Sequence, residues 1–186
     1  MGIDILGWVE QRIQDDWQGV LDAGAILERD YRLLGLLFGV RDHSILPLAE
    51  GRGLPEDTSK EVQLALAGYP VVPSCTWISW DEMRKLDWES GKIVTQKLTI
   101  ELYLGKGDDP KFQGTTTTGK PSRLEWDEYR KLQKEGELRK DAYLYKVRSE
   151  PLEIPVHDSW RTVVSTMEQI GKSCGGNNCR MVVWFE

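Results

Sequence analysis

The sequence predicts an α+β fold: a mainly antiparallel sheet with the N- and C-terminal strands central and several helices packed on it. Residues 3–13 alternate between apolar and polar side chains, the period of two that is typical of a strand. Residues 181–185 form an uninterrupted apolar run, which favours a position in the middle of a sheet. Apolar residues recur at helical spacing in several segments between them, such as 31–38. We therefore expect the two terminal strands to lie side by side.

The length of 186 residues suffices for one domain whose core needs neither metal nor disulfide support. Pairing of the terminal strands would tie both ends of the chain into one sheet. We therefore expect residues 1–186 to form a single α+β domain.

Turn and capping signals divide the first half of the chain. One capping box pairs Thr58 with Glu61, and a second pairs Ser79 with Glu82. The expected elements are a strand over 3–13, a hairpin strand over 17–21, a helix over 31–38 that ends at Gly39, a helix over 58–67, an extended piece over 75–78 and a short helix over 79–86.

The second half begins with a clean alternation that predicts a long half-exposed strand over 92–104. Residues 105–119 are rich in glycine and threonine without periodicity, which predicts a mobile loop. The remaining expected elements are a helix over 124–135 with a capping box from Ser122 to Glu125, a strand over 142–148, a helix that Asp158 or Ser159 caps, a glycine-rich connector from Gly171 and the strand over 181–185.

Composition excludes several classes of protein. The net charge of −6 and the pI near 5.1 argue against nonspecific binding to nucleic acid, which requires a basic footprint. No run approaches the roughly 18 apolar residues of a membrane span, and the first residues lack the pattern of a signal peptide. We therefore expect a cytoplasmic location and no membrane partner. Three cysteines fit a reducing compartment.

The segment 35–55 is the first candidate site. An apolar helix there leads into a loop that is both partly apolar and strongly charged, and such loops commonly hold binding groups on a rigid scaffold. Arg41 and Arg52 provide the planar fork that suits phosphate or carboxylate, and Asp42 and His43 stand beside the first of them. Salt bridges to Asp42 or to Glu50 within the loop are the structural alternative.

Eight tryptophans are unusual for this length. Trp77 and Trp80 alternate with Ile78 and Ser79 after a proline-stiffened loop, so their rings could form a wall on which a flat base stacks. Burial in the core is the alternative for each ring. The predicted ligand-binding residues are therefore Arg41, Asp42, His43, Arg52, Trp77 and Trp80.

Residues 114–122 (GTTTTGKPS) resemble a phosphate-binding loop, G-x-x-x-x-G-K-[ST]. Pro121 stands where that motif needs a hydroxyl for magnesium, so we interpret the segment as a flexible connector that leads into a capped helix. An anion could still rest at the helix start beside Lys120 and Arg123.

Metal binding and catalysis have weaker signals. Cys174 and Cys179 could join His43 and His157 as zinc ligands, but their spacing is looser than that of a zinc knuckle. The two Asp–His neighbours do not reveal a nucleophile. Glu10 is a weak candidate acid or base whose alternative is a solvated strand carboxylate. We therefore predict no catalytic residue, no metal and no cofactor.

Five landmarks of the chain resemble a family of small, largely uncharacterised proteins that bacteria and their viruses encode. They are MGIDILGWVE, RDYRLLGLLFGVR, RGLP, TWISWDEM and RMVVWF, and they spread over most of the chain. The family often carries an asparagine–aromatic pair and a histidine–serine pair where this chain has Asp42-His43 and Ser74-Cys75. The resemblance implies the fold and a viral or bacterial origin, and it names no reaction.

The hypothesis that follows is a phage-type protein that sequesters a small anionic ligand, such as a cyclic or modified nucleotide of a defence signal, without catalysis. A homo-oligomer is compatible with this hypothesis. One alternative is a hydrolase that cleaves a phosphodiester or related bond with His43 or Glu10 as the acid–base group. The other is a protein-binding inhibitor of a host factor with an exposed aromatic patch.

Overall fold

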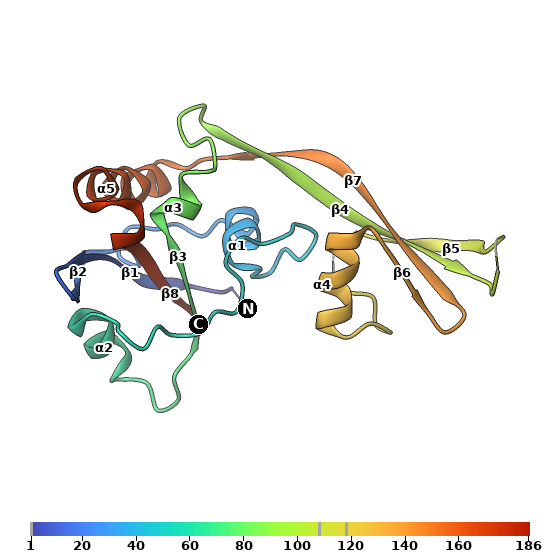
Figure 1. The fold of residues 1–186 in the computed structure, drawn as a ribbon, viewed down its shortest axis with the longest axis horizontal. Coiled ribbons are helices and arrows are strands. Elements are labelled where there is room, and N and C mark those ends of the chain that lie inside the picture. The colour runs from blue at the N-terminus through green and yellow to red at the C-terminus, as the bar shows by residue number, and fades with distance from the viewer. Residues whose placement is uncertain (1, 108, 118) are drawn as a thin grey trace. The chain divides into compact units, whose positions relative to one another are not determined.

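A computed structural model describes residues 2–107, 109–117 and 119–186. Over these residues the chain forms two four-stranded antiparallel sheets and five α-helices, so the predicted α+β class is confirmed (Figure 1). Contacts group the chain into two compact units. Unit 1 comprises Met1–Asp30, Leu48–Ile93 and Ile154–Glu186, and unit 2 comprises Tyr31–Pro47 and Val94–Glu153. The single domain expected from the sequence stays a prediction.

The sheet of unit 1 has the strand order β2-β1-β8-β3. The terminal strands β1 (Ile5–Ile13) and β8 (Cys179–Phe185) are its two central strands, with Val9 opposite Met181. The edge strands are β2 (Asp16–Asp22) and β3 (Ser74–Ser79). The predicted pairing of the chain ends is therefore confirmed. The six strand residues from Cys179 to Trp184 are all buried, as an apolar run in a central strand requires.

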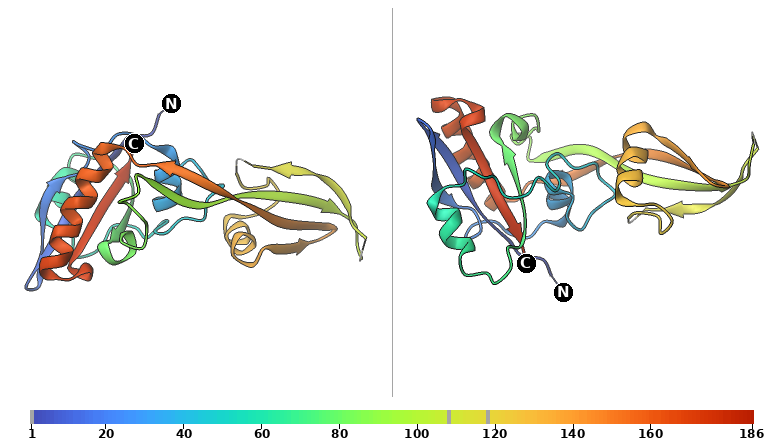
Figure 2. Two further views of the ribbon diagram at one scale, coloured as in Figure 1. Left: turned by 90° about the horizontal axis from the view of Figure 1, so that it is seen from above. Right: turned by 60° about the horizontal axis from the view of Figure 1, so that its bottom comes forward.

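Three helices belong to unit 1. The helix α5 (Asp158–Cys174) packs against β1 and β8 through its apolar stripe, which includes Trp160, Val163 and Met167 (Figure 2). The short helix α2 (Lys60–Leu66) buries Val62 and Leu66 in a cluster with Val182 and Trp184 of β8. Strand β3 leads directly into α3 (Trp80–Met83).

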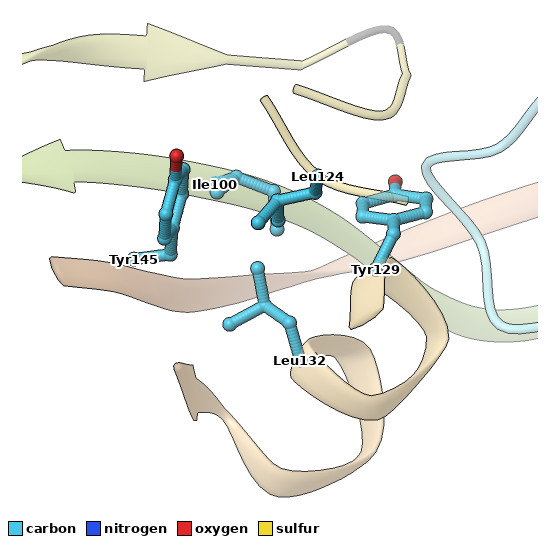
Figure 3. Packing of buried hydrophobic residues seen from close by; sticks show 5 residues of the cluster. All are labelled: Ile100, Leu124, Tyr129, Leu132 and Tyr145. Carbon is cyan, nitrogen blue, oxygen red and sulfur yellow. The ribbon is translucent and has the colours of Figure 1, made fainter. Parts of the chain in front are cut away.

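The sheet of unit 2 has the strand order β5-β4-β7-β6. Its strands are β4 (Lys92–Leu104), β5 (Lys111–Thr116), β6 (Glu137–Lys140) and β7 (Tyr143–Pro155). The helix α4 (Trp126–Glu135) packs on this sheet, and Leu132 and Tyr129 of α4 form a core cluster with Ile100, Leu124 and Tyr145 (Figure 3). The other helix of unit 2, α1 (Tyr31–Phe38), has the predicted bounds and ends at Gly39, whose φ is +71°.

Several sequence expectations for 105–155 are wrong. Residues 111–116 form β5, because threonine and Phe112 suit a pleated strand and β4 offers a free edge. Asp108 and Thr118, which belonged to the expected loop, lie outside the described residues. Strand β6 is an additional element, and β7 continues to Pro155.

Helix ends differ from the expected caps. Ser59 rather than Thr58 caps α2, since its hydroxyl accepts the amide of Val62. Glu125 caps α4 in a capping box with Glu128, and Ser122 takes no part. The cap of α5 is His157, and that helix continues through Gly171 to Cys174.

Within the described part of the chain, none of the helices has the length and the apolar character to cross a bilayer.

Candidate ligand-binding site

Arg180 on β8 is itself buried and is the centre of a polar cluster in unit 1. Its Nε donates to a carboxylate oxygen of Glu10 at 2.6 Å, and Glu10 has no exposed surface. The two terminal nitrogens donate to the carboxylate and to the carbonyl of Asp57, at 2.9 and 3.0 Å. Its guanidinium lies 3.8 Å from the centre of the Trp17 ring. Arg180 thus joins β1, β8 and the segment before α2.

Glu10 therefore has a role that the sequence did not indicate. The carboxylate also accepts the amide of Ser59 at 2.7 Å, so its oxygens are engaged by Arg180 and by the start of α2. A group that is fully buried and ion-paired is neither the solvated strand carboxylate nor the acid–base candidate expected from the sequence.

Arg52 forms a second cluster with Glu82 and Trp77. Its terminal nitrogens donate to the two carboxylate oxygens of Glu82 at 2.8 and 2.5 Å, the paired geometry that a guanidinium favours. They also donate to the carbonyls of Trp77 and Leu48. The guanidinium lies 4.9 Å from the centre of the Trp77 ring. The salt bridge of Arg52 is thus made to Glu82, and not to a residue of its own loop.

The local sequence explains the position of Glu82. It is the third residue of α3, and its carboxylate accepts the amide and the hydroxyl of Ser79 at 3.1 and 2.9 Å. This capping box was predicted. Because the cap holds the carboxylate at the start of α3, Arg52 reaches it from the loop before β3.

The two clusters line one hollow of about 430 Å³, which we call the indole hollow. Its walls are two indole rings, three cationic side chains, two acidic side chains and two small polar residues, namely Trp17, Trp77, Arg52, Lys85, Arg180, Asp81, Glu82, Ser79 and Asn177. Aromatic walls with a few convergent polar groups are typical of small-molecule sites.

The charges around the hollow are mostly compensated inside unit 1. Asp81 pairs with Arg84 at 2.9 Å, Glu82 pairs with Arg52, and Arg180 is held by two carboxylates. Lys85 is exposed and forms no ion pair with any residue that the structure describes. Of the three cationic side chains that line the hollow, Lys85 is therefore the one whose amine can donate to a ligand.

The carboxylates of Glu82 and Asp57 stay ionised at neutral pH. The hydrogen bond from Arg52 lowers the pKa of Glu82 to about 2, and the bonds from Ser79 act in the same direction. Burial opposes ionisation of Asp57, but the hydrogen bonds from Arg180 and Trp17 outweigh it and lower the pKa of that carboxyl. Neither group is suited to exchange protons near pH 7.

Two of the predicted ligand-binding residues, Arg52 and Trp77, thus line the indole hollow. Trp80 does not line it: its ring is 8% exposed and packs so closely on Gly171 of α5 that a Cβ there would overlap the indole. Trp80 is therefore buried in the core, which was the alternative expected from the sequence.

The other predicted residues, Arg41, Asp42 and His43, belong to unit 2. The carboxylate of Asp42 accepts the amide and the hydroxyl of Ser44 at 3.0 and 2.6 Å. The carbonyl of His43 accepts from Tyr129 and Gln133 of α4, at 2.7 and 3.0 Å. Arg41 is exposed, with a φ of +66°. These residues thus belong to a loop of unit 2 that contacts α4, and none of the three is among the lining residues of the indole hollow.

The ring of His43 lies edge-on to Trp126, with 4.8 Å between the ring centres. Lys120 and Arg130 lie 5.9 and 5.6 Å from the centre of the same indole. Lys120 also donates to the carbonyl of Leu124. The start of α4 beside Lys120, where the sequence allowed an anion, is already capped by the carboxylates of Glu125 and Glu128.

Sequence reasoning missed Trp17, Lys85 and Arg180. Arg180 carried one available signal, since it is the charged residue that directly precedes the apolar run of β8. A charge at the end of a central strand must find a buried partner, and Glu10 lies opposite it in the register of β1 and β8.

All three cysteines are free thiols. Burial raises the pKa of Cys179 to about 12, with a smaller contribution from Cys174, so this thiol is unreactive at neutral pH. Over the described residues, histidine, cysteine and acidic side chains form no cluster that could hold a metal ion.

Comparisons of this chain with protein-family models, with curated proteins and with solved structures give no match.

Proposed function

We propose that the indole hollow of unit 1 binds a small nucleotide-derived ligand with a negatively charged group and holds it without transforming it. The observation that carries this proposal is the pair of indole rings, Trp17 and Trp77, in one hollow with Lys85. An aromatic ring can stack on any nucleobase, and such stacking contributes about 1–3 kcal/mol per base. A volume of about 430 Å³ is in the range of pockets for ligands of this size.

The compensated charges favour a ligand of low charge. Arg52 and Arg180 use most of their donors on protein carboxylates and carbonyls, so Lys85 is the group that we assign to the anionic part of the ligand. A polyphosphate would also approach the acidic side chains of Asp81 and Glu82. We therefore expect one phosphate, as in a nucleoside monophosphate or a cyclic nucleotide, to bind better than a triphosphate.

Binding without reaction is supported by the state of the acidic groups. Glu82, whose pKa is about 2, is a poor general base, and Ser79 donates its hydroxyl to that same carboxylate. Neither histidine lines the hollow. A protein of this kind, acting in the cytoplasm of a bacterial host, would lower the free concentration of a nucleotide signal, as expected for sequestration of a defence signal by a phage protein.

The proposal is tested by a thermal-shift screen of nucleoside monophosphates, cyclic mononucleotides, cyclic dinucleotides and triphosphates, followed by calorimetry on each hit. We expect at least one hit with one phosphate per base. The complex is then denatured, and the released ligand is examined by chromatography. Intact ligand supports sequestration, whereas a cleaved product would establish the hydrolase alternative.

Lys85→Gln tests the assigned site. We expect the affinity for the hit to fall by about tenfold, because a charge-assisted hydrogen bond contributes roughly 1.5 kcal/mol or more. The matched control is Lys172→Gln, which removes an exposed lysine that pairs with Glu168 on α5, away from the hollow. Equal affinities of both variants and the wild type would remove the hollow as the binding site. Failure of every nucleotide to bind, together with capture of a host protein, would favour the protein-binding alternative.

A further inference from the structure

A second hollow lies in unit 2 and plays no part in the proposed function. Its volume is about 210 Å³, and it lies between β4, β5 and the segment before α4. Ile100, Leu102 and Pro121 contribute apolar surface, and Thr116, Ser122 and Tyr145 contribute hydroxyl groups. We call it the tyrosine hollow. No charged side chain is among its lining residues in the described part of unit 2.

Tyr145 is the unusual member of this lining. Its side chain belongs to the core cluster of unit 2 and the residue is 1% exposed. In Figure 3 its hydroxyl points away from Leu132 toward the side on which β5 lies, and the β5 residues Gly114 and Thr116 line the hollow with it. This hydroxyl is not one of the fully buried unpaired atoms, so it is accessible from the hollow, and within the described residues it has no hydrogen-bond partner. Buried tyrosine hydroxyls usually have one.

Tyr129 provides an internal comparison. It is equally buried, at 1% exposed, and lies in the same cluster. Its hydroxyl donates to the carbonyl of His43 at 2.7 Å. In the core of unit 2, the hydroxyl of Tyr129 is thus hydrogen-bonded within the protein, whereas Tyr145 lines a hollow.

The chemistry of Tyr145 is that of a donor. Burial raises the pKa of its phenol, so the hydroxyl stays protonated well above neutral pH. A protonated phenol at an apolar wall can donate one hydrogen bond to a guest, and apolar side chains can contact the rest of it.

We propose that the tyrosine hollow binds a small, uncharged, single-ring compound with one hydrogen-bond acceptor, to which the hydroxyl of Tyr145 donates. The ring contacts Ile100, Leu102 and Pro121. The size fits, because an apolar cavity of about 150 Å³ holds benzene, and pockets for larger ligands are typically above about 300 Å³. A charged ligand is disfavoured because the lining side chains are uncharged. The two cations that act on Tyr145 from outside the lining are already engaged, Arg123 over the Tyr143 ring and Lys140 with Glu128.

The test uses acetophenone, which has one ring and one carbonyl acceptor, and α-methylstyrene, which has the same shape without the acceptor. Both are titrated into the full-length protein labelled with ¹⁵N, and amide shifts are followed by NMR. We expect saturable shifts at Ile100, Gly114 and Ser122 with acetophenone, and weaker binding of α-methylstyrene.

Tyr145→Phe removes the donor and keeps the ring. Acetophenone should then bind roughly three- to tenfold more weakly, the range expected for one neutral hydrogen bond, while α-methylstyrene binds as it does to the wild type. The control is Tyr143→Phe, on the same strand but outside the lining, which should leave both affinities unchanged. Ser122→Leu should fill the hollow and abolish binding of both compounds.

The folding control is the amide spectrum of each variant, which should stay dispersed if unit 2 is folded. Absence of saturable shifts in the wild type would mean that water alone occupies the hollow and would overturn the proposal. Equal affinity of acetophenone for the wild type and Tyr145→Phe would also overturn it. These outcomes concern unit 2 alone, so they leave the proposed function of unit 1 unaffected.

Discussion

At the scale of single residues, two carboxylate–guanidinium pairs in unit 1 differ in burial and therefore in energetic role. The side chains of Glu10 and Arg180 are 0% and 6% exposed, whereas those of Glu82 and Arg52 are 27% and 26% exposed. A fully buried pair contributes little net stability relative to apolar side chains, but the removal of one partner leaves the other charge without compensation. A partly exposed pair is screened by solvent, so its loss costs less.

The variant Glu10→Gln should destabilise the protein strongly. Arg180 would keep Asp57 but lose its buried partner, so we expect a loss of about 3 kcal/mol, the low end for breaking a buried pair. The free energy of unfolding is measured by urea denaturation. The matched control is Asp4→Asn, which breaks the exposed pair with Arg29 and should cost less than about 1 kcal/mol. Similar losses in the two variants would contradict a special role for the buried pair.

The variant Glu82→Gln should change the dependence of stability on pH. Because the folded-state pKa of Glu82 is lowered from 4.5 to about 2, its ionised form stabilises the protein above pH 4.5, and this contribution is lost as the pH falls toward about 2. With the carboxylate 27% exposed, we expect the variant to be roughly 1–2 kcal/mol less stable at pH 7.

Urea denaturation of wild type and Glu82→Gln between pH 2 and pH 7 measures this difference. It should shrink as the pH decreases, since protonated Glu82 and glutamine are then equivalent. Glu89→Gln, which changes an exposed carboxylate nearby, should differ from the wild type by less than about 0.5 kcal/mol throughout. A difference for Glu82→Gln that is constant with pH would refute the assigned ion pair with Arg52.

At the scale of elements, the contact between α3 and α5 fixes Trp80 in the core. Gly171 lies inside α5, where alanine would normally stabilise a helix by about 1 kcal/mol. The ring of Trp80 occupies the place of the missing Cβ. The steric overlap therefore decides whether Gly171→Ala raises or lowers the free energy of unfolding. The close approach of the two helices therefore explains a glycine that sequence reasoning placed in a connector.

Gly171→Ala should accordingly destabilise the protein by about 1–3 kcal/mol, as overpacking does. Thermal or urea denaturation measures the effect. Gly68→Ala is the control, because nothing lies within 4 Å of its Cβ position. Gly171→Ala should cost less stability in the Trp80→Leu background than in the wild type, because the indole that overlaps the new Cβ is then absent. A stabilising effect of Gly171→Ala alone would show that the helices separate easily.

At the scale of the whole molecule, contacts divide the chain into two compact units, each with its own four-stranded sheet. Leu132 is buried in the core of unit 2, and Val163 of α5 is buried in unit 1. The free energy of local opening can differ between such units if each is a separate cooperative structure.

Hydrogen exchange of Leu132→Ala and Val163→Ala tests this division. Each truncation should cost about 1–5 kcal/mol at its own site. We expect Leu132→Ala to lower amide protection mainly in Val94–Glu153, and Val163→Ala to lower it mainly in unit 1. Equal loss of protection throughout the chain in both variants would show one cooperative unit, and would thus support the single domain expected from the sequence.

The sequence by itself determined the elements whose signals are local or repeat along one strand. The alternation in β1 and β4, the apolar run of β8, the helix α1 and the capping box of α3 were all predicted from neighbouring residues. Arg52 and Trp77 were likewise identified as binding candidates from residue type and position. These properties depend on backbone period and side-chain chemistry, which are written in the sequence.

Only the tertiary structure decided which side chains meet. It placed Trp17 and Arg180 in the indole hollow, paired Arg52 with Glu82, and buried Trp80 against Gly171. It also formed β5 from a segment without periodicity, because the edge of β4 satisfies the hydrogen bonds of that segment. Such pairings join residues far apart in the chain, and their energies depend on burial and geometry that no local pattern contains.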